Sequence, residues 1–407
     1  MSKNKMISSQ EAMNLILDQL PIINKEKIDT LLSVGRILKE PIHAERDQPP
    51  FDRVTMDGIA ISYEALKRGV NQFSIENTQF AGDAQIALKD KNFCIEIMTG
   101  AILPKNTNCI IPIEWIHINN SIAVLDTNYQ PQKLQYIHQQ GSDHQKNTEV
   151  LGIGHKIEPM DISLILSCGK KYIEVSSDPK ICIISNGNEL IAAGDPILPH
   201  QIRMSNGPAI IVMLEQQGFK NCEYIHLVDD KNIQQEHIKK HLISSDVLIL
   251  SGGVSMGKAD FIPQVLKECG VKNIFHKIRQ RPGKPMWFGI GPKKQLIFAL
   301  PGNPVSTITC CRHYIVPVLQ RACGRDFFID EYVKLQQQIK FQPDLTYFLP
   351  VRLVNSQNGE IKAYPVETNT SGDFASLIGT DGYIELISKS NLFEESESIK
   401  FFRWKMP

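Results

Sequence analysis

The sequence lacks several features that define other classes of protein. None of its apolar runs approaches the roughly 18 residues that a membrane-spanning helix needs, so we expect no membrane partner. Charge of one sign is not in excess, because 44 Lys and Arg residues balance 44 Asp and Glu residues, and this argues against nucleic-acid binding through an overall positive field. The N-terminal stretch has no apolar segment followed by a small-residue cleavage site, so we expect a cytoplasmic protein.

Cysteine spacing of the kind that holds zinc is also missing. The nine cysteines include no CxxC pair, and the adjacent Cys310 and Cys311 would point in different directions on a helix. Several cysteines sit inside apolar stretches. We therefore interpret them as reduced core thiols, and the spacing disfavours a cysteine zinc site.

What the sequence does contain is a globular composition, with 42% hydrophobic and 22% charged residues. Its 407 residues predict about two to four domains. Ser8 followed by Glu11 is a capping-box pattern that predicts a helix ending before Pro21. Residues 41–140 read as short β-rich pieces separated by turn residues, which predicts a small β-dominated unit.

Residues 180–324 alternate apolar strands with longer helices, a pattern typical of a mostly parallel sheet covered by helices on both faces. The expected strands span residues 181–185, 223–228, 247–250, 273–278, 286–289 and 296–300. The expected helices span residues 205–217, 232–243, 261–269 and 304–321. Residues 326–407 return to short strands with Asn-Gly and Asp-Gly turns at 358–359 and 381–382, which predicts a β-barrel or a β-sandwich.

The loops that follow the strands of such a sheet are where ligands bind, and four of them carry polar residues. They span residues 185–189, 229–230, 251–257 and 301–304. The glycine-rich loop 251–257 offers backbone N–H groups to a phosphate, although a tight structural turn explains it equally well.

Three carboxylates stand at the ends of these loops: Glu189, Asp229 and Asp260. Oxygen ligands next to a phosphate cradle suit Mg²⁺. Asp260 would serve equally as a helix N-cap, and Asp229 as part of a solvated turn. The convergence of all three favours the metal site.

Cationic side chains occur between two expected strands, in Arg281-Pro282-Gly283-Lys284-Pro285 and at Lys277 just before it. Two prolines and a glycine fix where these charges point, which suits an oxyanion substrate. The alternative is an ordinary surface hairpin with solubilising charge.

Eight motifs in this order resemble the MoeA family of molybdenum cofactor synthesis, to which the E domain of gephyrin is related. They are MDG at 56–58, MTGA at 98–101, S-x-G-x-E-L at 185–190, QIR-x-SN at 201–206, the Asp229-Asp230 pair, SGGVSMG-x-x-D ending at Asp260, RPGKP at 281–285 and PGNPVS at 301–306.

The resemblance implies an α/β multidomain fold and a homodimer. The implied domains are an elongated discontinuous domain over 1–45 and 142–178, an inserted β domain over 46–141, a MogA-like doubly wound α/β domain over 179–326 that binds molybdopterin, and a C-terminal β-barrel over 327–407. The active site would lie between the last two domains of one subunit and the inserted domain of the other. Asp57 and Thr99 would then reach across the interface.

By the same resemblance, the expected activity is that of a molybdenum insertase. Adenylylated molybdopterin and molybdate would react in a Mg²⁺-dependent step that releases AMP and yields molybdenum cofactor. The metal ligands would be Glu189, Asp229 and Asp260, and the implied catalytic residues are these three with Asp57, Thr99, Lys277 and Arg281. The implied substrate-binding residues are Asp143, Ser251, Gly252, Gly253, Ser255, Lys284, Pro301, Asn303, Pro304, Ser306, Arg352 and Ser371. Of these positions, Lys277, Arg281, Arg352 and Ser371 match those that bind molybdate in the family.

Expected partners are a MogA-like adenylyltransferase and the molybdoenzymes, or their chaperones, that receive the cofactor. The chain departs from the family pattern at Asn188, which replaces an acidic residue, and at Ser142, which replaces the glutamate of R-x-x-G-E-D. Two alternatives stay open: a non-catalytic dimeric scaffold of the gephyrin E-domain type, and a MogA-like adenylyltransferase. Whether molybdenum or tungsten is delivered also stays open, because their oxyanions have nearly the same size and charge.

Overall fold

The computed structural model describes residues 6–21, 23–254, 261–325, 329–367, 369–370, 372–388 and 390–405. The chain forms two compact units. The larger unit comprises Met1–Glu40, Ile153–Pro159 and Tyr172–Pro407, and the smaller comprises Pro41–Gly152 and Met160–Lys171. Within the described ranges, every helix is too short or too polar to cross a membrane. The four-domain division stays a prediction.

The larger unit begins with helix α1 (Ser9–Leu17), and its start is the predicted capping box. The Ser8 hydroxyl accepts from the backbone N–H of Glu11, and the Glu11 carboxylate accepts from the N–H of Ser8. Ala12 and Ile16 are fully buried against the central sheet. A short 3₁₀ turn η1 (Thr30–Leu32) and the antiparallel pair β1 (Lys25–Asp29) and β12 (Tyr172–Ser176) complete this region.

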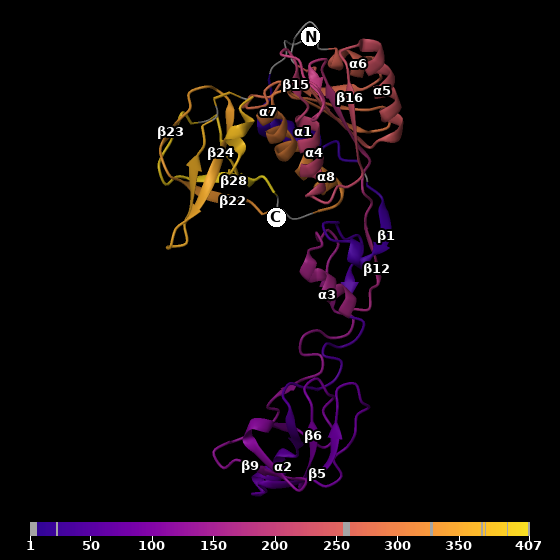
Figure 1. Ribbon diagram of the computed structural model, residues 1–407, viewed down its shortest axis with the longest axis vertical. Coiled ribbons are helices and arrows are strands. Elements are labelled where there is room, and N and C mark those ends of the chain that lie inside the picture. The colour runs from indigo at the N-terminus through magenta and orange to yellow at the C-terminus, as the bar shows by residue number, and fades with distance from the viewer. Residues whose placement is uncertain are drawn as a thin grey trace. The chain divides into compact units, whose positions relative to one another are not determined.

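A six-stranded sheet forms the centre of the larger unit (Figure 1). Its order is β16 (Cys222–Leu227), β13 (Ile181–Asn186), β17 (Val247–Ser251), β21 (Leu296–Leu300), β20 (Trp287–Ile290) and β18 (Lys272–His276). The first four strands are parallel; β20 is antiparallel to β21, and β18 is antiparallel to β20 and so runs in the direction of the first four. The predicted mostly parallel sheet is confirmed.

Helices cover both faces of this sheet because its side chains alternate between two apolar cores. Ile181 and Ile183 pack with helix α4 (Asn206–Glu215) and with the long helix that begins at Pro304. Cys182 and Ile184 pack instead with α5 (Lys231–Ser244) and α6 (Ile262–Glu268). All nine cysteines are free thiols, as predicted.

The C-terminal region is a closed barrel. Of the two predicted architectures, the β-barrel is therefore confirmed and the β-sandwich is wrong. Its strands are β24 (Thr346–Asn355), β25 (Ile361–Pro365), β22 (Glu331–Leu335), β28 (Ser398–Arg403) and β26 (Gly382–Leu386), and pairing of β26 with β24 closes the ring. The smaller elements are β23 (Ile339–Lys340), β27 (Leu392–Phe393) and the 3₁₀ turn η4 (Phe374–Leu377). Asn358-Gly359 forms the predicted turn, with Gly359 at φ +85°, but the predicted Asp381-Gly382 turn is wrong because Gly382 begins β26.

The helix after β21 docks the barrel onto the sheet. It runs as α7 (Pro304–Cys310), a π-helical segment η3 (Cys311–Ile315) and α8 (Val316–Ala322). Pro317 lacks a backbone N–H, and a wider turn just before a proline is a usual response to that missing donor. Within η3, Arg312 donates to the carbonyl oxygen of Arg403, and His313 Nδ1 lies 3.1 Å from the hydroxyl of Tyr383.

The smaller unit is β-dominated, as predicted. Its six-stranded sheet has the order β7 (Cys109–Pro112), β4 (Gly58–Ile61), β6 (Phe93–Ile97), β5 (Gln72–Gln79), β9 (Ile122–Leu125) and β8 (Ile116–Asn119). Two short pairs join β2 (Ile42–His43) to β11 (Glu149–Leu151) and β3 (Arg53–Val54) to β10 (Ile137–His138). Helices α2 (Tyr63–Lys67) and α3 (Pro159–Ser167) and the 3₁₀ turn η2 (Ile113–Trp115) complete it.

The buried His313 makes a testable contribution to the pH dependence of stability. Burial lowers its pKa to about 3, whereas an unfolded histidine titrates near pH 6.5. Between these two values the unfolded chain binds a proton that the folded chain does not, so this site destabilises the fold as the pH falls through that window. We expect His313→Phe to reduce the fall in thermal midpoint between about pH 7 and about pH 4. The exposed His200, changed to Phe, is the control and should leave the wild-type profile unchanged; an unchanged profile in His313→Phe would contradict the account.

Candidate active site

Three loops of the larger unit meet at one edge of the central sheet. The parallel registers align Ser185 of β13 with Ser251 of β17, and Ser251 with Leu300 of β21. The chain leaves all three strands in the same direction there, as the loop prediction required. The loops therefore face one another across a short distance.

A cleft with two lobes lies at this edge. The first lobe has a volume of about 390 Å³ and the second about 420 Å³, both in the range that small-molecule sites occupy. The two lobes share one wall, formed by Asn186, Glu189, Gly252, Gly302 and Asn303. Because the wall is shared, a ligand in one lobe lies directly beside a ligand in the other.

The glycines of the 251–257 loop permit a close backbone approach. Gly252 has φ +90°, and a Cβ atom there would lie 2.6 Å from the carbonyl oxygen of Asn186. Gly253 has φ +71°, and its Cβ would meet Ile262 at 2.7 Å. Side chains are therefore excluded at both positions, and the backbone itself lines the cleft. Ser255 and Asp260 lie outside the described residues.

Asn206 holds two of the loops together. Its Nδ2 donates to the Ser251 hydroxyl at 3.0 Å and to the Gly302 carbonyl oxygen at 2.8 Å. Asn206 is the first residue of α4 and the last residue of the QIR-x-SN motif. The motif thus fixes the spacing between the glycine loop and the PGNPVS loop.

Asn186 is the most unusual residue of the shared wall. Its side chain is only 4% exposed, yet among the described residues neither its Oδ1 nor its Nδ2 has a hydrogen-bond partner. A buried amide of this kind costs stability unless something bonds to it. Its position on both lobes indicates that the missing partner is a ligand.

Two of the three predicted metal ligands lie in the cleft. Glu189 lines both lobes and Asp229 lines the second. Asn188 holds Asp229 through two reciprocal bonds, from the N–H of Asn188 to Asp229 Oδ2 at 3.2 Å and from the N–H of Asp229 to Asn188 Oδ1 at 3.0 Å. The departure at Asn188 therefore still positions the neighbouring carboxylate.

Asp230, the other member of the aspartate pair, has a structural role. Its Oδ1 accepts from the N–H groups of Asn232 and Ile233, which makes it the N-cap of α5. The donor chemistry of the cleft suits Mg²⁺, because the second lobe carries three hard oxygen donors: the Glu189 and Asp229 carboxylates and the Asn186 amide oxygen, which no described residue bonds.

The predicted cations lie on or next to the barrel and line neither lobe. The exposed Arg281 belongs to β19 (Gln280–Arg281), which pairs with β24, and its guanidinium lies 5.3 Å from the ring centroid of Tyr347. The exposed Arg352 lies five residues beyond Tyr347 on β24, so a regular strand directs the two side chains to opposite faces. Lys277, which has φ +74°, and the exposed Lys284 flank β19.

The remaining predicted residues of the larger unit divide into two groups. Those that line the cleft are Ser251, Gly252, Gly253, Pro301, Asn303 and Pro304. Ser306 is 3% exposed within α7 and lines neither lobe. Ser371 lies outside the described residues, but the neighbouring Gly372 and Phe374 line the first lobe, so the barrel contributes to the cleft.

Asp57, Thr99 and Asp143 belong to the smaller unit. The N–H of Thr99 donates to Asp57 Oδ1 at 2.6 Å, and hydrogen bonds from the backbone and side chain of Thr99 lower the pKa of the Asp57 carboxyl. Arg53 donates to His138 Nδ1 at 3.1 Å, which leaves His138 Nε2 to donate to Asp143 Oδ1 at 2.9 Å. Both carboxylates are thus held in fixed orientations.

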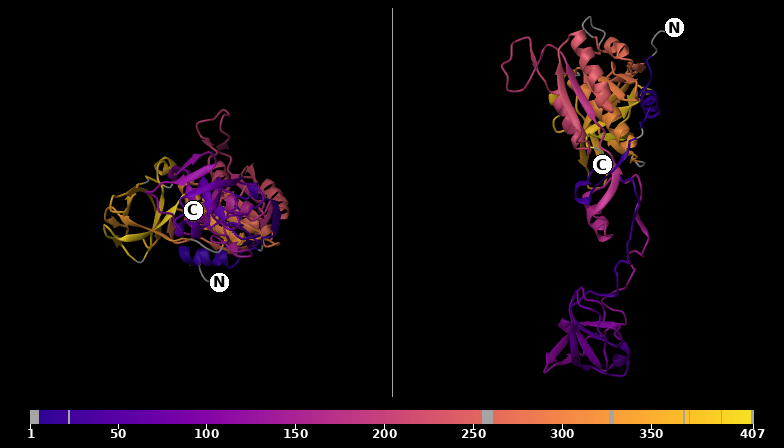
Figure 2. Two further views of the ribbon diagram at one scale, coloured as in Figure 1. Left: turned by 90° about the horizontal axis from the view of Figure 1, so that it is seen from below. Right: turned by 90° about the vertical axis from the view of Figure 1, so that its right-hand side faces the viewer.

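Several residues of the cleft were not predicted as site residues from the sequence. They are Asn186, Arg203, Met204, Asn206 and Phe374. Arg203 ends the arm between β14 (Leu190–Ile191) and β15 (Ile202–Arg203), which projects from the sheet in Figure 2. Its guanidinium donates to the carbonyl oxygens of Ala192 and Asp195 and so holds the arm. The QIR-x-SN motif signalled three of the five, and Asn186 lies in the polar loop 185–189 that was predicted to face a ligand; nothing marked Phe374.

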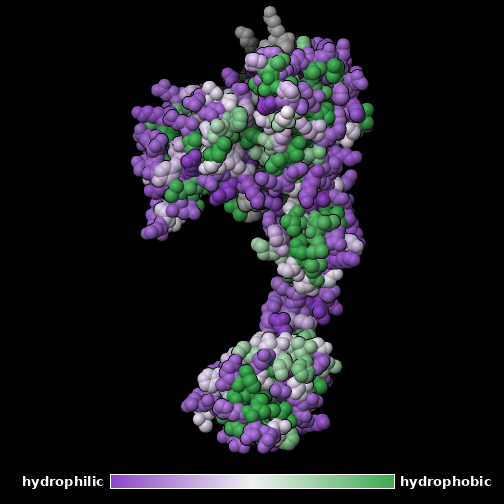
Figure 3. Space-filling view, in the orientation of Figure 1, coloured by the Kyte–Doolittle hydropathy of each residue, from purple (hydrophilic) through white to green (hydrophobic). Residues whose placement is uncertain are grey.

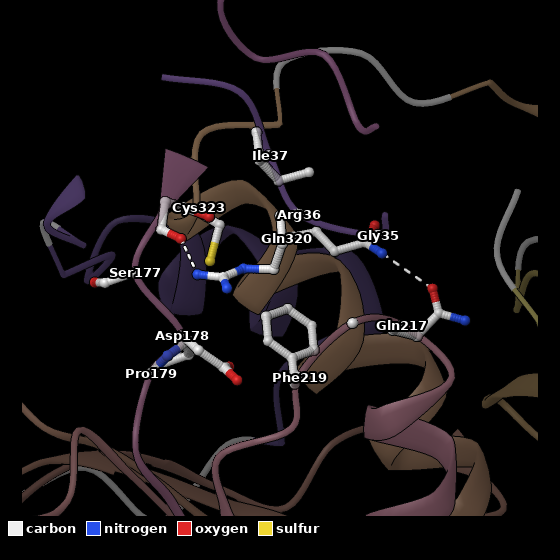
Figure 4. A pocket seen from close by; sticks show the side chains of 12 residues that line it. Gly35, Arg36, Ile37, Ser177, Asp178, Pro179, Gln217, Phe219, Gln320 and Cys323 are labelled. Carbon is white, nitrogen blue, oxygen red and sulfur yellow. Dashed lines mark hydrogen bonds between the residues drawn. The ribbon is translucent and has the colours of Figure 1, made fainter. Parts of the chain in front are cut away.

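A separate hollow of the larger unit is too small to be the site (Figure 4). It lies between Arg36, Asp178 and Phe219 and has a volume of about 10 Å³, room for about one water molecule. Arg36 donates to the carbonyl oxygen of Ser176, and Gln320 donates to Gln217. Its polar groups therefore serve the fold.

Two glycine variants separate backbone strain from the close approach in the cleft. Gly252 and Gly359 have similar φ values of +90° and +85°, but nothing lies within 4 Å of a Cβ at 359. Gly359→Ala should cost about 1–2 kcal/mol of unfolding free energy through φ alone, and Gly252→Ala about 1–3 kcal/mol more because a loop must move. Calorimetric unfolding measures both. Only Gly252→Ala should also weaken the binding of a ligand in the cleft, and equal effects of the two variants would contradict the account.

Comparison with known proteins identifies the family. Residues 7–169 match the MoeA N-terminal region (domain I and II), 182–321 a probable molybdopterin binding domain, and 332–404 the MoeA C-terminal region (domain IV).

A molybdopterin molybdenumtransferase of Synechocystis sp. is 37% identical over 98% of this chain and 100% of its own length. A gephyrin of Dictyostelium discoideum is 30% identical over 79% of this chain and 50% of its own length. The structure of a molybdopterin biosynthesis MoeA protein from Pyrococcus horikosii superposes with a TM-score of 0.80 at 27% identity, covering 98% of this chain and 100% of that one. The chain therefore belongs to the MoeA family, whose curated members are the molybdopterin molybdenumtransferases of molybdenum cofactor biosynthesis.

Proposed function

We propose that this protein inserts molybdate into adenylylated molybdopterin and releases AMP in a Mg²⁺-dependent step, yielding molybdenum cofactor. The observation that carries the proposal is the two-lobed cleft, whose shared wall combines the Glu189 carboxylate with the glycine backbone at Gly252 and Gly302. Such a wall lets ligand groups in the two lobes contact the same residues. A MogA-like adenylyltransferase would supply the substrate, and molybdoenzymes or their chaperones would accept the product.

The backbone N–H of Gly253, together with Asn303 at the start of α7, would hold the phosphates of the nucleotide, whereas the N–H of Gly252 already donates to the Leu300 carbonyl oxygen at 3.1 Å. Loops between a strand and a helix present N–H groups toward an anion, and the missing side chains let the phosphate approach. The Asn186 amide, unpartnered among the described residues, can both donate to and accept from this ligand. Ser251, held by Asn206, offers a further polar contact.

Glu189 and Asp229, with Asp260 as the third ligand that the sequence predicts, would hold Mg²⁺. When bound, the ion supplies positive charge to the phosphate oxygens. The chain's own part is to keep the two carboxylates in place. Asn188 does this for Asp229, and His226 fixes the Glu189 loop by donating to the Gly187 carbonyl oxygen at 2.8 Å.

Lys277, Arg281, Arg352 and Ser371 would bind molybdate, with Lys284 nearby. The hydrogen-bonded pairing of β19 with β24 fixes Arg281 on the barrel next to Tyr347. Fixed guanidinium groups suit tetrahedral oxyanions because they present several donors at once. Each cation should therefore affect the apparent affinity for molybdate more than the affinity for the nucleotide.

Asp57, Thr99 and Asp143 would act in the active site of a partner copy, so that the working form is a homodimer. The hydrogen bonds around Asp57 and Asp143 keep these exposed carboxylates oriented. Exposed apolar side chains on α3, Met160 and Leu166, offer surface that a second copy could cover (Figure 3).

The direct test measures AMP release from adenylylated molybdopterin with Mg²⁺ and molybdate, omitting each component in turn. We expect release to require both. Tungstate in place of molybdate measures the preference between the two oxyanions. A folded protein that releases no AMP would overturn the proposal and favour the scaffold, and adenylylation of molybdopterin with ATP would favour the adenylyltransferase.

The carboxylates give the test its matched variants. Glu189→Gln and Asp229→Asn should each lower AMP release at least about 100-fold, because the charge that orients the metal and phosphates is lost. Asp230→Asn is the control: it removes a charge next to Asp229 but touches only the α5 cap, so it should lower the thermal midpoint slightly and leave AMP release near the wild-type rate. Similar losses in all three variants would contradict the assignment.

Mixing two inactive variants tests the shared active site. Asp57→Ala and Glu189→Gln dimers should each be inactive, but subunit exchange creates mixed dimers with one intact site. Random mixing makes half of the dimers mixed, so about one quarter of the wild-type activity should return. Mixing Glu189→Gln with Asp229→Asn is the control, since both lie in one cleft. If the Asp57→Ala mixture recovers no more than this control after confirmed exchange, the shared site is wrong.

A further inference from the structure

A second cluster of side chains of the types that bind metals lies where the strands of the central sheet begin, at the opposite end of the strands from the cleft. Cys182 is the second residue of β13 and Glu223 the second residue of β16, and the two are register partners on adjacent parallel strands. His241 lies in the last turn of α5, which packs on the same face of the sheet as Cys182. The cleft forms where these strands end, whereas this cluster forms where they begin.

The three donor atoms are close enough for one ion. The Cys182 sulfur, a carboxylate oxygen of Glu223 and an imidazole nitrogen of His241 all lie within 4.8 Å of one another. His241 Nδ1 and Glu223 Oε2 are 3.5 Å apart. Donors on a tetrahedral zinc ion are separated by about 3.4–3.6 Å, as follows from the usual bond lengths. Only small side-chain rotations would be needed.

The burial of the cluster points to a ligand. His241 is 2% exposed, and within the described part of the chain its Nδ1 has no hydrogen-bond partner. Cys182 is fully buried, while the Glu223 side chain is 59% exposed. An ion could therefore reach the two buried donors past the exposed Glu223 carboxylate, and it would satisfy His241 Nδ1, which has no hydrogen-bond partner among the described residues.

We propose that Cys182, Glu223 and His241 form a zinc site that fastens the edge strand β16 to β13 and α5. One sulfur, one nitrogen and one oxygen donor select zinc over Mg²⁺, which prefers oxygen alone. Solvent would fill the fourth position next to Glu223. The site is separate from the cleft and does not depend on the proposed reaction.

Binding requires one proton to leave. Burial raises the pKa of the Cys182 thiol to about 12, so the thiol is protonated before the ion arrives. The S–H bond breaks, the sulfur keeps the electron pair and forms the Zn–S bond, and the proton passes to solvent. Burial lowers the pKa of His241, so the imidazole is already neutral and able to bind.

The test uses the full-length protein with Zn²⁺ and with Co²⁺ as a coloured substitute. Zn²⁺ should bind one ion per chain and raise the thermal midpoint. Co²⁺ should give the near-ultraviolet thiolate-to-metal absorption that only a cysteine ligand produces. Glu223→Gln changes an exposed side chain and leaves the core intact. It should weaken Zn²⁺ binding at least about tenfold, because even the loss of a residue that only hydrogen-bonds a metal ligand usually weakens metal binding by that much.

Cys182→Ala should abolish the thiolate absorption, and Cys222→Ala is its matched control. Cys222 precedes Glu223 on the same strand, so its side chain lies on the other face of the sheet and its loss should leave the absorption unchanged. Absence of the absorption in the wild-type protein, or equal Zn²⁺ affinity in wild type and Glu223→Gln, would overturn the proposal.

Discussion

The parallel pairing of β13, β17 and β21 is the constraint on which the site depends. Because these strands start and end in register, the three polar loops that follow them must lie at one edge of the sheet. The antiparallel strands β18 and β20 flank the hairpin that carries Arg281. Within this hairpin, β19 pairs with β24 of the barrel. The η3 segment fixes the barrel from the other side through Arg312 and His313. The barrel can therefore supply Gly372 and Phe374 to a cleft whose other walls come from the sheet.

Within this frame, the cleft exchanges local stability for binding. The backbone approach between Gly252 and Asn186 excludes a Cβ atom, and the Asn186 amide is buried without a partner among the described residues. The unpartnered amide is unfavourable until a polar ligand bonds to it, whereas glycine adopts the close approach at no steric cost. Asn206 and Asn188 carry the opposite role, because their hydrogen bonds hold the loops and Asp229 in position before any ligand arrives.

Periodicity and turn residues predicted most of the fold, since strand and helix patterns are local. The strands of the central sheet and the capping box at Ser8 agree with the structure closely, and the loop positions follow from topology.

The features that could not be predicted depend on contacts between distant residues. Asn186 resembles any polar residue at a strand end, and only the approach of Gly252 reveals its burial. Cys182, Glu223 and His241 lie 41 and 18 residues apart, so no spacing rule joins them. The Asp381-Gly382 dipeptide is typical of a turn, but in the structure Gly382 begins β26.

The central claim is that the edge of the parallel sheet holds the nucleotide of the substrate. The most direct measurement is a crystal structure of the protein with AMP and Mg²⁺. The account predicts the AMP phosphate against the backbone of Gly252 and Gly253, with the Asn186 amide hydrogen-bonded to the nucleotide. Nucleotide bound away from the two-lobed cleft, or an Asn186 amide that remains unpartnered with the nucleotide in place, would contradict it.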